Sequence, residues 1–412
     1  MNILVINQPL NNRGDESAHK ALIRTLNKIN PHYKITILSA GSNPDSIKQF
    51  NVNLPNVEYV NLPIYKGWKK AAIVGLKYNM PFLWKIHPTL SQIINIYRQN
   101  DYVICAPGGI CMGGFQNWIH LFFLKIAQYT HRPLIYYGRS FGPFPTTTSD
   151  NKKFKKISLE MLNYFSFLSI RDKKTEELAQ KLNLTYTQTI DTAFLETPNA
   201  AIPNSIVNKI GNSNYVVFVP NLLIWHYAYK NRISKETVLS FYSQIIDIIF
   251  KKYPDHKIIM LPQTFNYGTY DGDDIHLFHE IEQLKKDNRI IVIEDKYSSD
   301  IQQAIIAKSK FLIGARYHSV VFAINNNTPF IALSYEHKIS GLLATLDKEN
   351  CMIDIIHALD NEENIKKTIQ SINNMITSIS KDESAREKAK ELAQKCFNIM
   401  YKNFLHRKNE LL

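Results

Sequence analysis

Short apolar runs alternate with longer amphipathic segments along almost the whole chain. Runs rich in Val, Ile and Leu, each followed by apolar positions at helical spacing, are typical of strands buried on both faces of a parallel sheet. The predicted strands are residues 2–7, 34–40, 101–109, 133–144, 167–172, 185–194, 214–221, 256–264, 289–295, 310–316 and 329–335.

Helical patterns lie between the predicted strands, and the alternating strands and helices fall into two groups. Helices are predicted at 173–183, 235–252, 273–287, 298–309, 319–326 and 382–408. A stretch rich in Pro, Asn and Gly at 196–214 interrupts the alternation and is the best candidate linker. The sequence therefore predicts an α/β protein with two Rossmann-like, doubly wound domains, at 1–200 and 201–380, and a long C-terminal amphipathic helix within 381–412.

The amino-acid composition indicates a globular protein of two domains but does not identify its binding partner. The chain has 412 residues, of which 45% are hydrophobic, enough for two domains that each bury a core. The formal net charge of +13 suits anionic partners, but the surplus is dispersed over predicted helix faces. Because no basic-then-apolar leader and no apolar stretch of roughly 18 residues is present, we expect a cytoplasmic protein. The four cysteines lack zinc-ligand spacing.

Polar motifs follow several predicted strands, where doubly wound sheets bind ligands. The loop NNRGDESA includes Asn11 and Asp15, and APGGICMGGF includes Gly108 and Gly109. Such loops can bind sugar or phosphate oxygens through polar side chains and backbone N–H groups. A capped helix and an ordinary turn explain the same residues equally well.

Two further strand ends carry arginines. Arg139 lies in YYGRSFGPF, and Arg171 lies in SIRD before a predicted helix. Asp172 is explained as a helix cap, whereas a cation at the positive end of a helix dipole calls for a nearby anion. Asp191, at another strand end, is either structural or a partner for Arg171.

The motif GARYHS places Arg316, His318 and Ser319 where a predicted strand gives way to a helix. Arg316 offers a planar fork for a carboxylate or phosphate, and the new helix adds unpaired N–H groups. His318 can titrate near neutral pH beside such an anion. This combination predicts an anion site with a proton-transfer group. Downstream, Glu336 either orients His318, accepts a sugar hydroxyl or charges a helix N-terminus.

A long loop in the second domain, MLPQTFNYGTYDGDD, contributes Gln263 as a further candidate in the cleft. Its aspartates lack the glycine and glutamate spacing of a calcium loop.

The segment 65–87 is basic, aromatic and amphipathic, with five lysines and two tryptophans. This combination is typical of helices that lie on an anionic membrane surface. An ordinary helix pair that covers the N-terminal sheet is the alternative.

Taken in order, these motifs resemble those of the polysaccharide pyruvyl transferase family. The markers are NRGDESA, APGG, YYGRSFGP, SIRD, DTAF and GARYHSVVFAINNNTPFIALSYEHKISGLL, spread over residues 2–345. The resemblance implies a GT-B-like fold whose two domains face a cleft. It also implies transfer of a pyruvyl group from phosphoenolpyruvate to two hydroxyls of one sugar, which forms a cyclic ketal on a cell-surface, capsular or exopolysaccharide precursor.

By motif, the resemblance makes Arg171 and Arg316 ligands for the phosphate and carboxylate of phosphoenolpyruvate, and His318 the acid–base residue. The chemistry agrees, because this donor carries both anionic groups and its methylene carbon must be protonated. Neither requirement involves a metal or a cofactor. Segment 62–98 matches nothing distinctive in the family, so the acceptor sugar, and whether it is lipid-linked, stay open.

Two other functions fit the same sequence. A GT-B glycosyltransferase with a nucleotide-sugar donor would share the fold, with Glu336 as the carboxylate that binds the ribose. A non-catalytic module would bind anionic membranes through 65–87. We expect phosphoenolpyruvate and a glycan as partners, and no nucleic acid.

Overall fold

The computed structural model describes the backbone of residues 1–10, 12–265 and 273–405. Asn11, a candidate from the sequence, lies outside the described residues, as do Asn266 and Tyr267. The chain forms two compact units: unit 1 comprises 1–10, 18–195 and 391–412, and unit 2 comprises 11–17 and 196–390. Both units are discontinuous in sequence, whereas the predicted domains at 1–200, 201–380 and 381–412 were single segments.

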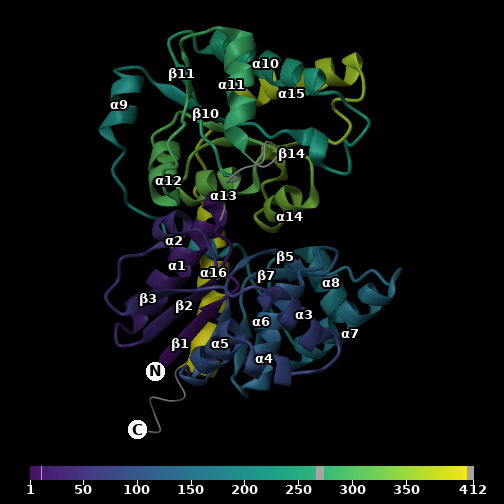
Figure 1. The fold of residues 1–412 in the computed structure, drawn as a ribbon. Helices are drawn as coiled ribbons and strands as arrows, with labels where there is room; N and C mark the ends of the chain where they lie inside the picture. Colours follow the sequence, from purple (N-terminus) through teal and green to yellow (C-terminus); the bar gives the residue numbers. More distant parts are fainter. Residues whose placement is uncertain (11, 266–272, 406–412) are drawn as a thin grey trace. The chain divides into compact units, whose positions relative to one another are not determined.

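Unit 1 contains a seven-stranded parallel sheet with the order β3-β2-β1-β4-β6-β8-β9 (Figure 1). The order reverses between β1 and β4, and ligands of doubly wound sheets bind beyond the carboxyl ends of strands at such a reversal. A separate parallel pair joins β5 to β7. The strands are β1 (Asn2–Ile6), β2 (Lys34–Ala40), β3 (Val57–Leu62), β4 (Tyr102–Cys105), β5 (Gly108–Met112), β6 (Leu134–Tyr136), β7 (Arg139–Phe141), β8 (Phe167–Ile170) and β9 (Thr187–Gln188).

Helices cover both faces of this sheet because successive side chains of a buried strand point to opposite sides. From β1, Leu4 and Ile6 join a core formed with α3, α5 and α6, while Ile3 and Val5 pack with α1 and the end of α16. The helices of this unit are most of α1 (Arg13–Ile29), α2 (Pro44–Phe50), α3 (Trp68–Lys77), α4 (Phe82–Ile86), α5 (Pro88–Arg98), α6 (Trp118–Tyr129), α7 (Ser149–Tyr164), α8 (Lys173–Lys181) and part of α16 (Ser384–Met400).

Unit 2 contains a six-stranded parallel sheet with the order β12-β11-β10-β13-β14-β15. Here the order reverses between β10 and β13, so the carboxyl ends of these two strands mark the expected ligand position. The strands are β10 (Tyr215–Val219), β11 (Lys257–Met260), β12 (Ile290–Val292), β13 (Leu312–Gly314), β14 (Phe330–Ser334) and β15 (Met352–Asp354).

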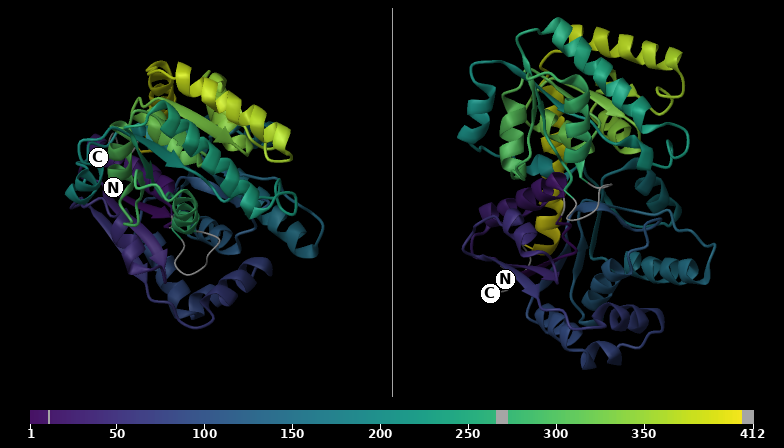
Figure 2. Two further views of the ribbon diagram at one scale, coloured as in Figure 1. Left: turned by 90° about the horizontal axis from the view of Figure 1, so that it is seen from above. Right: turned by 45° about the horizontal axis from the view of Figure 1, so that its top comes forward.

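Polar caps start several helices of unit 2, whose apolar faces then pack on the sheet. Ser234, Ser298 and Asn361 accept backbone N–H groups at the starts of α10, α12 and α15. Figure 2 shows α10 and α15 side by side, and both contribute to one apolar core. The helices are α9 (Asn204–Ile210), α10 (Lys235–Lys252), α11 (Asp274–Lys285), α12 (Ser299–Ala307), α13 (Tyr317–Asn325), α14 (His337–Thr345) and α15 (Glu362–Ser378).

Most predicted elements are present, and the differences have local causes. The strand predicted at 133–144 is broken into β6 and β7, because Gly138 adopts φ +55 between them. Within 185–194, only Thr187–Gln188 is extended. The long helix predicted at 382–408 ends at Met400, where a π-helical turn follows. The edge strands β3 and β15 were not predicted.

Across the described ranges, every helix is too short or too polar to cross a lipid bilayer.

Candidate active site

The carboxyl end of β13 brings Arg316 and His318 into one turn at the strand reversal of unit 2. β13 ends at Gly314, and Arg316 occupies the N-cap of α13 with extended backbone angles. The buried hydroxyl of Ser319 donates to the Arg316 carbonyl at 2.6 Å. A Cβ on Gly314 would lie 2.3 Å from that hydroxyl oxygen, so the turn requires glycine there. Ser319 therefore fixes the backbone that carries Arg316.

A buried carboxylate orients the Arg316 side chain. Nε of Arg316 donates to Oδ1 of Asp274 at 3.1 Å, and Nη2 donates to the same oxygen. Oδ2 of Asp274 accepts the backbone N–H groups of Gln263 at 2.9 Å and Thr264 at 3.0 Å. Burial lowers the pKa of Arg316, but the Asp274 carboxylate together with the Tyr335 and Tyr242 hydroxyls outweighs burial, so this pKa lies above its ordinary value. Arg316 is therefore a cation in a fixed position, because Asp274 binds one edge of its planar guanidinium through Nε and Nη2.

Polar aromatic residues surround the same end of the sheet. The side-chain amide of Asn221, just beyond β10, donates to the hydroxyl of Tyr335 at 2.7 Å. The Tyr242 hydroxyl donates to the Asn221 carbonyl at 2.8 Å. Trp225 is 48% exposed, and its indole N–H donates to the Asn221 amide oxygen at 3.3 Å. These hydrogen bonds connect the carboxyl end of β10 to Tyr335, the residue after β14, and so stabilise the expected ligand position. Trp225 is an exposed aromatic side chain near this position.

His318 is half-buried and lies against the start of α1. A Cβ on Gly14 would fall 1.8 Å from Nδ1 of His318, which no packing permits. The imidazole also meets the Tyr317 ring edge-to-face, with centroids 4.9 Å apart. Gly14 is therefore the residue that lets the first turn of α1, which belongs to unit 2, approach the imidazole, a contact that sequence patterns did not indicate.

The motif NRGDES belongs to unit 2, although the sequence placed it in the N-terminal domain. Arg13 forms an ion pair with Glu16 at 2.9 Å and donates to the Lys296 carbonyl at 2.9 Å. Glu16 also accepts the backbone N–H of Ser299 at 3.0 Å, at the start of α12. These buried contacts hold Gly14 against His318, so the motif positions the histidine.

Replacing Gly14 by alanine tests this contact. Alanine normally stabilises a helix relative to glycine, by about 0.5–1 kcal/mol. At Gly14, by contrast, the methyl group must displace the imidazole of His318, and a misplacement of about 1 Å can cost about 10²-fold in rate. We expect Gly14→Ala to lose turnover by about that factor, measured by steady-state kinetics. Gly341→Ala, in α14 with open space around its Cβ, is the control and should be neutral. Equal activity of the two variants would contradict the role of Gly14.

The other candidates in unit 2 bind neighbouring side chains of the same unit. Asp15 accepts from the side-chain amide of Asn12. Gln263 is buried, and its side chain donates to Gln302 at 2.7 Å. Glu336 occupies the N-cap position of α14 and pairs with Lys338 at 3.4 Å. Glu336 therefore charges the start of α14, one of the alternatives considered from sequence.

Arg139 in unit 1 is fully buried and binds the loop after β4. Its guanidinium donates to the carbonyls of Asn7 at 3.1 Å, Ala106 at 2.8 Å and Gly109 at 3.0 Å. A Cβ on Gly108 would lie 2.9 Å from Nη2 of Arg139. Gly108 thus leaves room for the Arg139 side chain, and Gly109 accepts a hydrogen bond from it through its carbonyl. From the sequence, this loop was instead a candidate for binding ligand oxygens through its backbone N–H groups.

A hollow of about 400 Å³ opens beside Arg139, at the strand reversal of unit 1. His120, on α6, lines it and is only 3% exposed. Burial, and then the charge of Arg139, lower the pKa of His120 well below its ordinary value, so the imidazole is neutral. Among the described residues, Nε2 of His120 has no hydrogen-bond partner. Sequence reasoning missed His120 because it lies in the apolar helix WIHLFFLKIA.

Arg171 and Asp191 pair in unit 1, one of the alternatives considered from sequence. Nη1 of Arg171 donates to Oδ2 of Asp191 at 2.6 Å, and the two side chains are 8% and 0% exposed. Asp172 caps α8 as predicted, by accepting the Thr175 N–H at 2.9 Å. Like Arg316, Arg171 is thus held by a buried carboxylate at the end of a strand.

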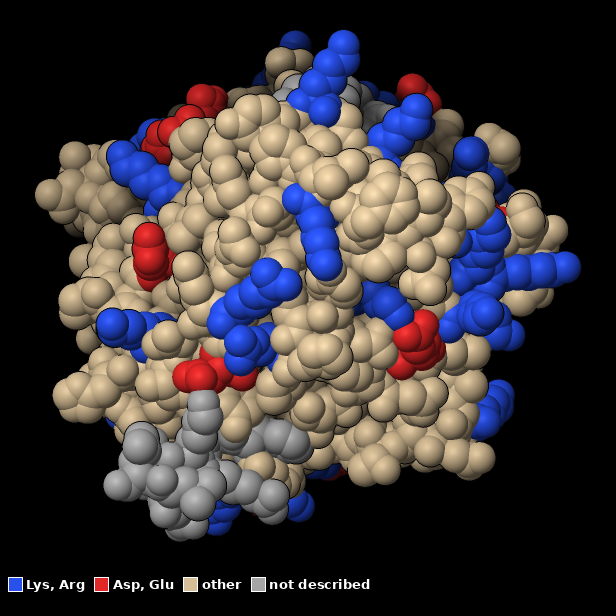
Figure 3. All heavy atoms as spheres, turned by 60° about the horizontal axis from the view of Figure 1, so that its bottom comes forward, with Lys and Arg blue, Asp and Glu red and all other residues tan. Residues whose placement is uncertain are grey.

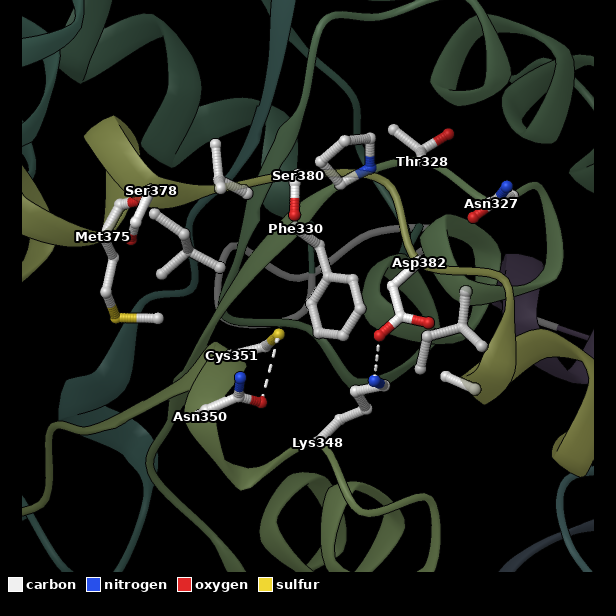
Figure 4. A pocket seen from close by; sticks show the side chains of 15 residues that line it. Asn327, Thr328, Phe330, Lys348, Asn350, Cys351, Met375, Ser378, Ser380 and Asp382 are labelled. Carbon is white, nitrogen blue, oxygen red and sulfur yellow. Dashed lines mark hydrogen bonds and ion pairs between the residues drawn. The ribbon is translucent and has the colours of Figure 1, made fainter.

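A smaller hollow of about 130 Å³ lies elsewhere in unit 2, between β14, the end of α15 and the start of α16 (Figure 4). Lys348 and Asp382 pair across it, and Phe330 and Cys351 line it. None of the candidate residues from sequence lies in this hollow.

Comparison with known proteins decides the family. A model described as polysaccharide pyruvyl transferase matches residues 12–337, which is well over half of the chain. The chain belongs to the polysaccharide pyruvyl transferase family. This membership confirms the resemblance seen in the motifs, and it makes the protein a member of a family of transferases.

One curated relative of similar sequence is the amylovoran biosynthesis protein AmsJ of Erwinia amylovora. It is 22% identical over 282 residues, which are 66% of this chain and 65% of AmsJ. The match thus spans slightly less than two thirds of the length of AmsJ.

Solved structures show the fold of this pyruvyl transferase family member. UDP-GlcNAc 2-epimerase of Neisseria meningitidis, bound to UDP-GlcNAc, covers 98% of the chain and 100% of its own, with TM-score 0.57 and 12% identity. UGT89C1 of Arabidopsis thaliana, complexed with quercetin, covers 98% and 97%, with TM-score 0.53 and 13% identity. At these identities only the fold is shared: a GT-B-like fold with two Rossmann-like units, as predicted.

Proposed function

We propose that the protein transfers the pyruvyl group of phosphoenolpyruvate to two hydroxyls of one sugar, which forms a cyclic ketal and releases phosphate. Family membership supports pyruvyl transfer. The observation that carries the proposal is the turn after β13, where a fixed cation, Arg316, and a titratable group, His318, share the start of a helix. A helix N-terminus with an oriented arginine suits the phosphate and carboxylate of this donor.

In the proposed reaction, His318 enters as an imidazolium and donates its proton to the methylene carbon of phosphoenolpyruvate. The resulting oxocarbenium-like C2 is attacked by the first sugar hydroxyl, whose proton passes to the neutral imidazole. The bond between C2 and the phosphate oxygen then breaks and phosphate leaves. The second hydroxyl attacks C2, and its proton passes to the released phosphate, which becomes hydrogen phosphate. Arg316 binds the anionic donor, Ser319 fixes the turn, and Arg171 is proposed as a second donor ligand. No step calls for a cofactor or a metal.

We place the acceptor at the hollow of unit 1 that Arg139 and His120 line. A buried neutral imidazole can either donate to or accept from a sugar hydroxyl. Trp68 also lines the hollow and supplies an apolar wall of the kind that sugar sites need.

The acceptor is proposed to be a precursor of a cell-surface or capsular polysaccharide. AmsJ is named for amylovoran biosynthesis, which supports a role in polysaccharide assembly. We further propose that the protein acts on this precursor in the cytoplasm, near the inner face of the membrane.

Thermal unfolding in the presence of candidate donors tests the donor class. A ligand at 100 times its dissociation constant adds about 2.7 kcal/mol to the free energy of unfolding, a shift of several degrees. We expect phosphoenolpyruvate to raise the unfolding temperature and UDP-GlcNAc to leave it unchanged. The comparison matters because the epimerase with a similar fold was solved with UDP-GlcNAc. Stabilisation by the nucleotide sugar alone would favour a GT-B glycosyltransferase.

A further inference from the structure

One segment of unit 1 combines exposed apolar side chains with lysines, and its sequence contains no carboxylate. Residues 59–100 hold six lysines and arginines and no aspartate or glutamate. Elsewhere the chain has 43 basic residues (49 − 6) against 36 acidic ones. This local imbalance therefore exceeds the general basic character of the chain.

The same region carries a disproportionate share of exposed hydrophobic surface. Of the twelve large hydrophobic residues that are exposed in the described parts of the chain, six lie within residues 64–86. They are Ile64 (51%), Tyr65 (51%), Tyr78 (60%), Met80 (36%), Phe82 (52%) and Ile86 (71%). Such clustering marks an interaction surface, whereas scattered single exposures do not.

This exposure is not a sign of poor packing, because the inner side of the helix pair is well fixed. Trp68 of α3 and Trp84 of α4 are buried in the core of unit 1. The Trp84 indole donates to the Ala72 carbonyl at 3.3 Å, and a Cβ on Gly75 would lie 2.2 Å from the indole nitrogen. The helices thus present their outer residues from a rigid base.

The lysines around these apolar side chains determine which partner fits. Lys66, Lys69, Lys70 and Lys85 are exposed, and their long stems can lie along apolar surface while the ammonium groups reach headgroups. Lys77 is different, because it pairs with Asp150 of α7 at 2.5 Å. Figure 3 views unit 1 from the end where α4 and α5 lie in Figure 1, and there lysines and arginines stand among uncharged residues with few carboxylates.

We infer that α3, α4 and the residues flanking them form a docking surface for an anionic lipid bilayer, with residues 64–86 lying in the interface. Aromatic and aliphatic side chains would insert at headgroup level, and the lysines would bind the anionic headgroups. A protein partner is the less suitable occupant, because lysine is depleted in protein interfaces and carboxylates would be needed opposite every lysine. This surface extends the proposed function by bringing the enzyme to lipid-linked precursors.

Co-sedimentation of the full chain with vesicles tests this inference. Binding to vesicles of phosphatidylglycerol and phosphatidylethanolamine is expected, with weaker binding to pure phosphatidylcholine and a loss of affinity at high salt. Phe82→Ser with Ile86→Ser should weaken binding at least about tenfold. Lys70→Gln with Lys85→Gln should weaken it about 25-fold, since each lysine near an anionic surface contributes roughly fivefold.

Matched controls separate the surface from general effects of charge and hydrophobicity. Leu284→Ser removes a side chain that is 54% exposed in unit 2, and Lys251→Gln with Lys366→Gln removes two exposed lysines there. These controls should keep wild-type affinity for the vesicles. Equal losses in controls and test variants, or no vesicle binding by the wild-type chain, would overturn the inference. So would a lipid-free dimer that Phe82→Ser with Ile86→Ser dissociates.

Because sedimentation needs no turnover, vesicle binding can be established even if pyruvyl transfer fails. Conversely, the Phe82→Ser with Ile86→Ser variant should retain wild-type phosphate release with a soluble acceptor, since neither residue lines the hollow beside Arg139.

Discussion

The His318→Ala variant is expected to lose about 10²–10⁴-fold in turnover, the usual contribution of general acid–base catalysis. In the proposed reaction this imidazole supplies the proton to the methylene carbon and later accepts one from a hydroxyl. Alanine at position 318 can do neither. Because His318 is half-buried and partly packed on Gly14, its removal should leave the unfolding temperature within a few degrees of wild type. Phosphate release from phosphoenolpyruvate in the presence of acceptor measures the effect.

The matched control for this experiment is His279→Ala. His279 is a partly exposed histidine of the same unit that pairs with Glu282 at 3.0 Å, and its removal should be silent. Wild-type turnover in His318→Ala would show that another group transfers the proton.

The Arg316→Lys variant is expected to bind phosphoenolpyruvate at least about tenfold more weakly. Lysine keeps a positive charge opposite Asp274, so the buried carboxylate still has a partner. Leaving that carboxylate unpaired would lower the free energy of unfolding by about 3–5 kcal/mol. Lysine lacks the planar fork of arginine, however, and cannot bind a carboxylate or phosphate at two points. The KM for phosphoenolpyruvate, or its dissociation constant by calorimetry, measures the loss.

Arg289→Lys is the control, because Arg289 also pairs with an aspartate in unit 2, at 2.6 Å from Asp287. This pair is remote in sequence from the motif, and its conservative exchange should not change donor affinity. If Arg316→Lys binds phosphoenolpyruvate as well as wild type, Arg316 serves only to hold Asp274.

Much of the fold follows from local patterns that the sequence displays. The helix predicted at 235–252 has those same limits, because Ser234 caps its start and apolar positions recur at helical spacing along it. The strand ending near Arg316 was also evident, since a buried parallel strand reads as one apolar run. Edge strands such as Val57–Leu62 and Met352–Asp354 were missed because they are mixed in polarity or only three residues long.

The site was predictable only where its residues are adjacent in sequence. Arg316 and His318 stand in one motif at a strand end, a position that doubly wound sheets use for ligands. Their supports, Asp274 and Gly14, come from distant segments and depend on tertiary contacts that no periodicity encodes. Arg171 and Arg139 were recognised as arginines at strand ends, and Asp191 was already one of the alternatives for pairing with Arg171. The bond from Arg139 to the carbonyl of Gly109 was not predicted, because it is fixed by packing in three dimensions.

The most direct measurement is mass spectrometry of a glycan acceptor incubated with phosphoenolpyruvate and the purified protein. Host polysaccharide fragments can serve as the acceptor panel, with His318→Ala as the inactive comparison. The account predicts that one carboxyethylidene unit is added per acceptor sugar and one phosphate is released, both absent with His318→Ala. Phosphoenolpyruvate left intact while a nucleotide sugar donates a glycosyl residue to the same panel would contradict the account.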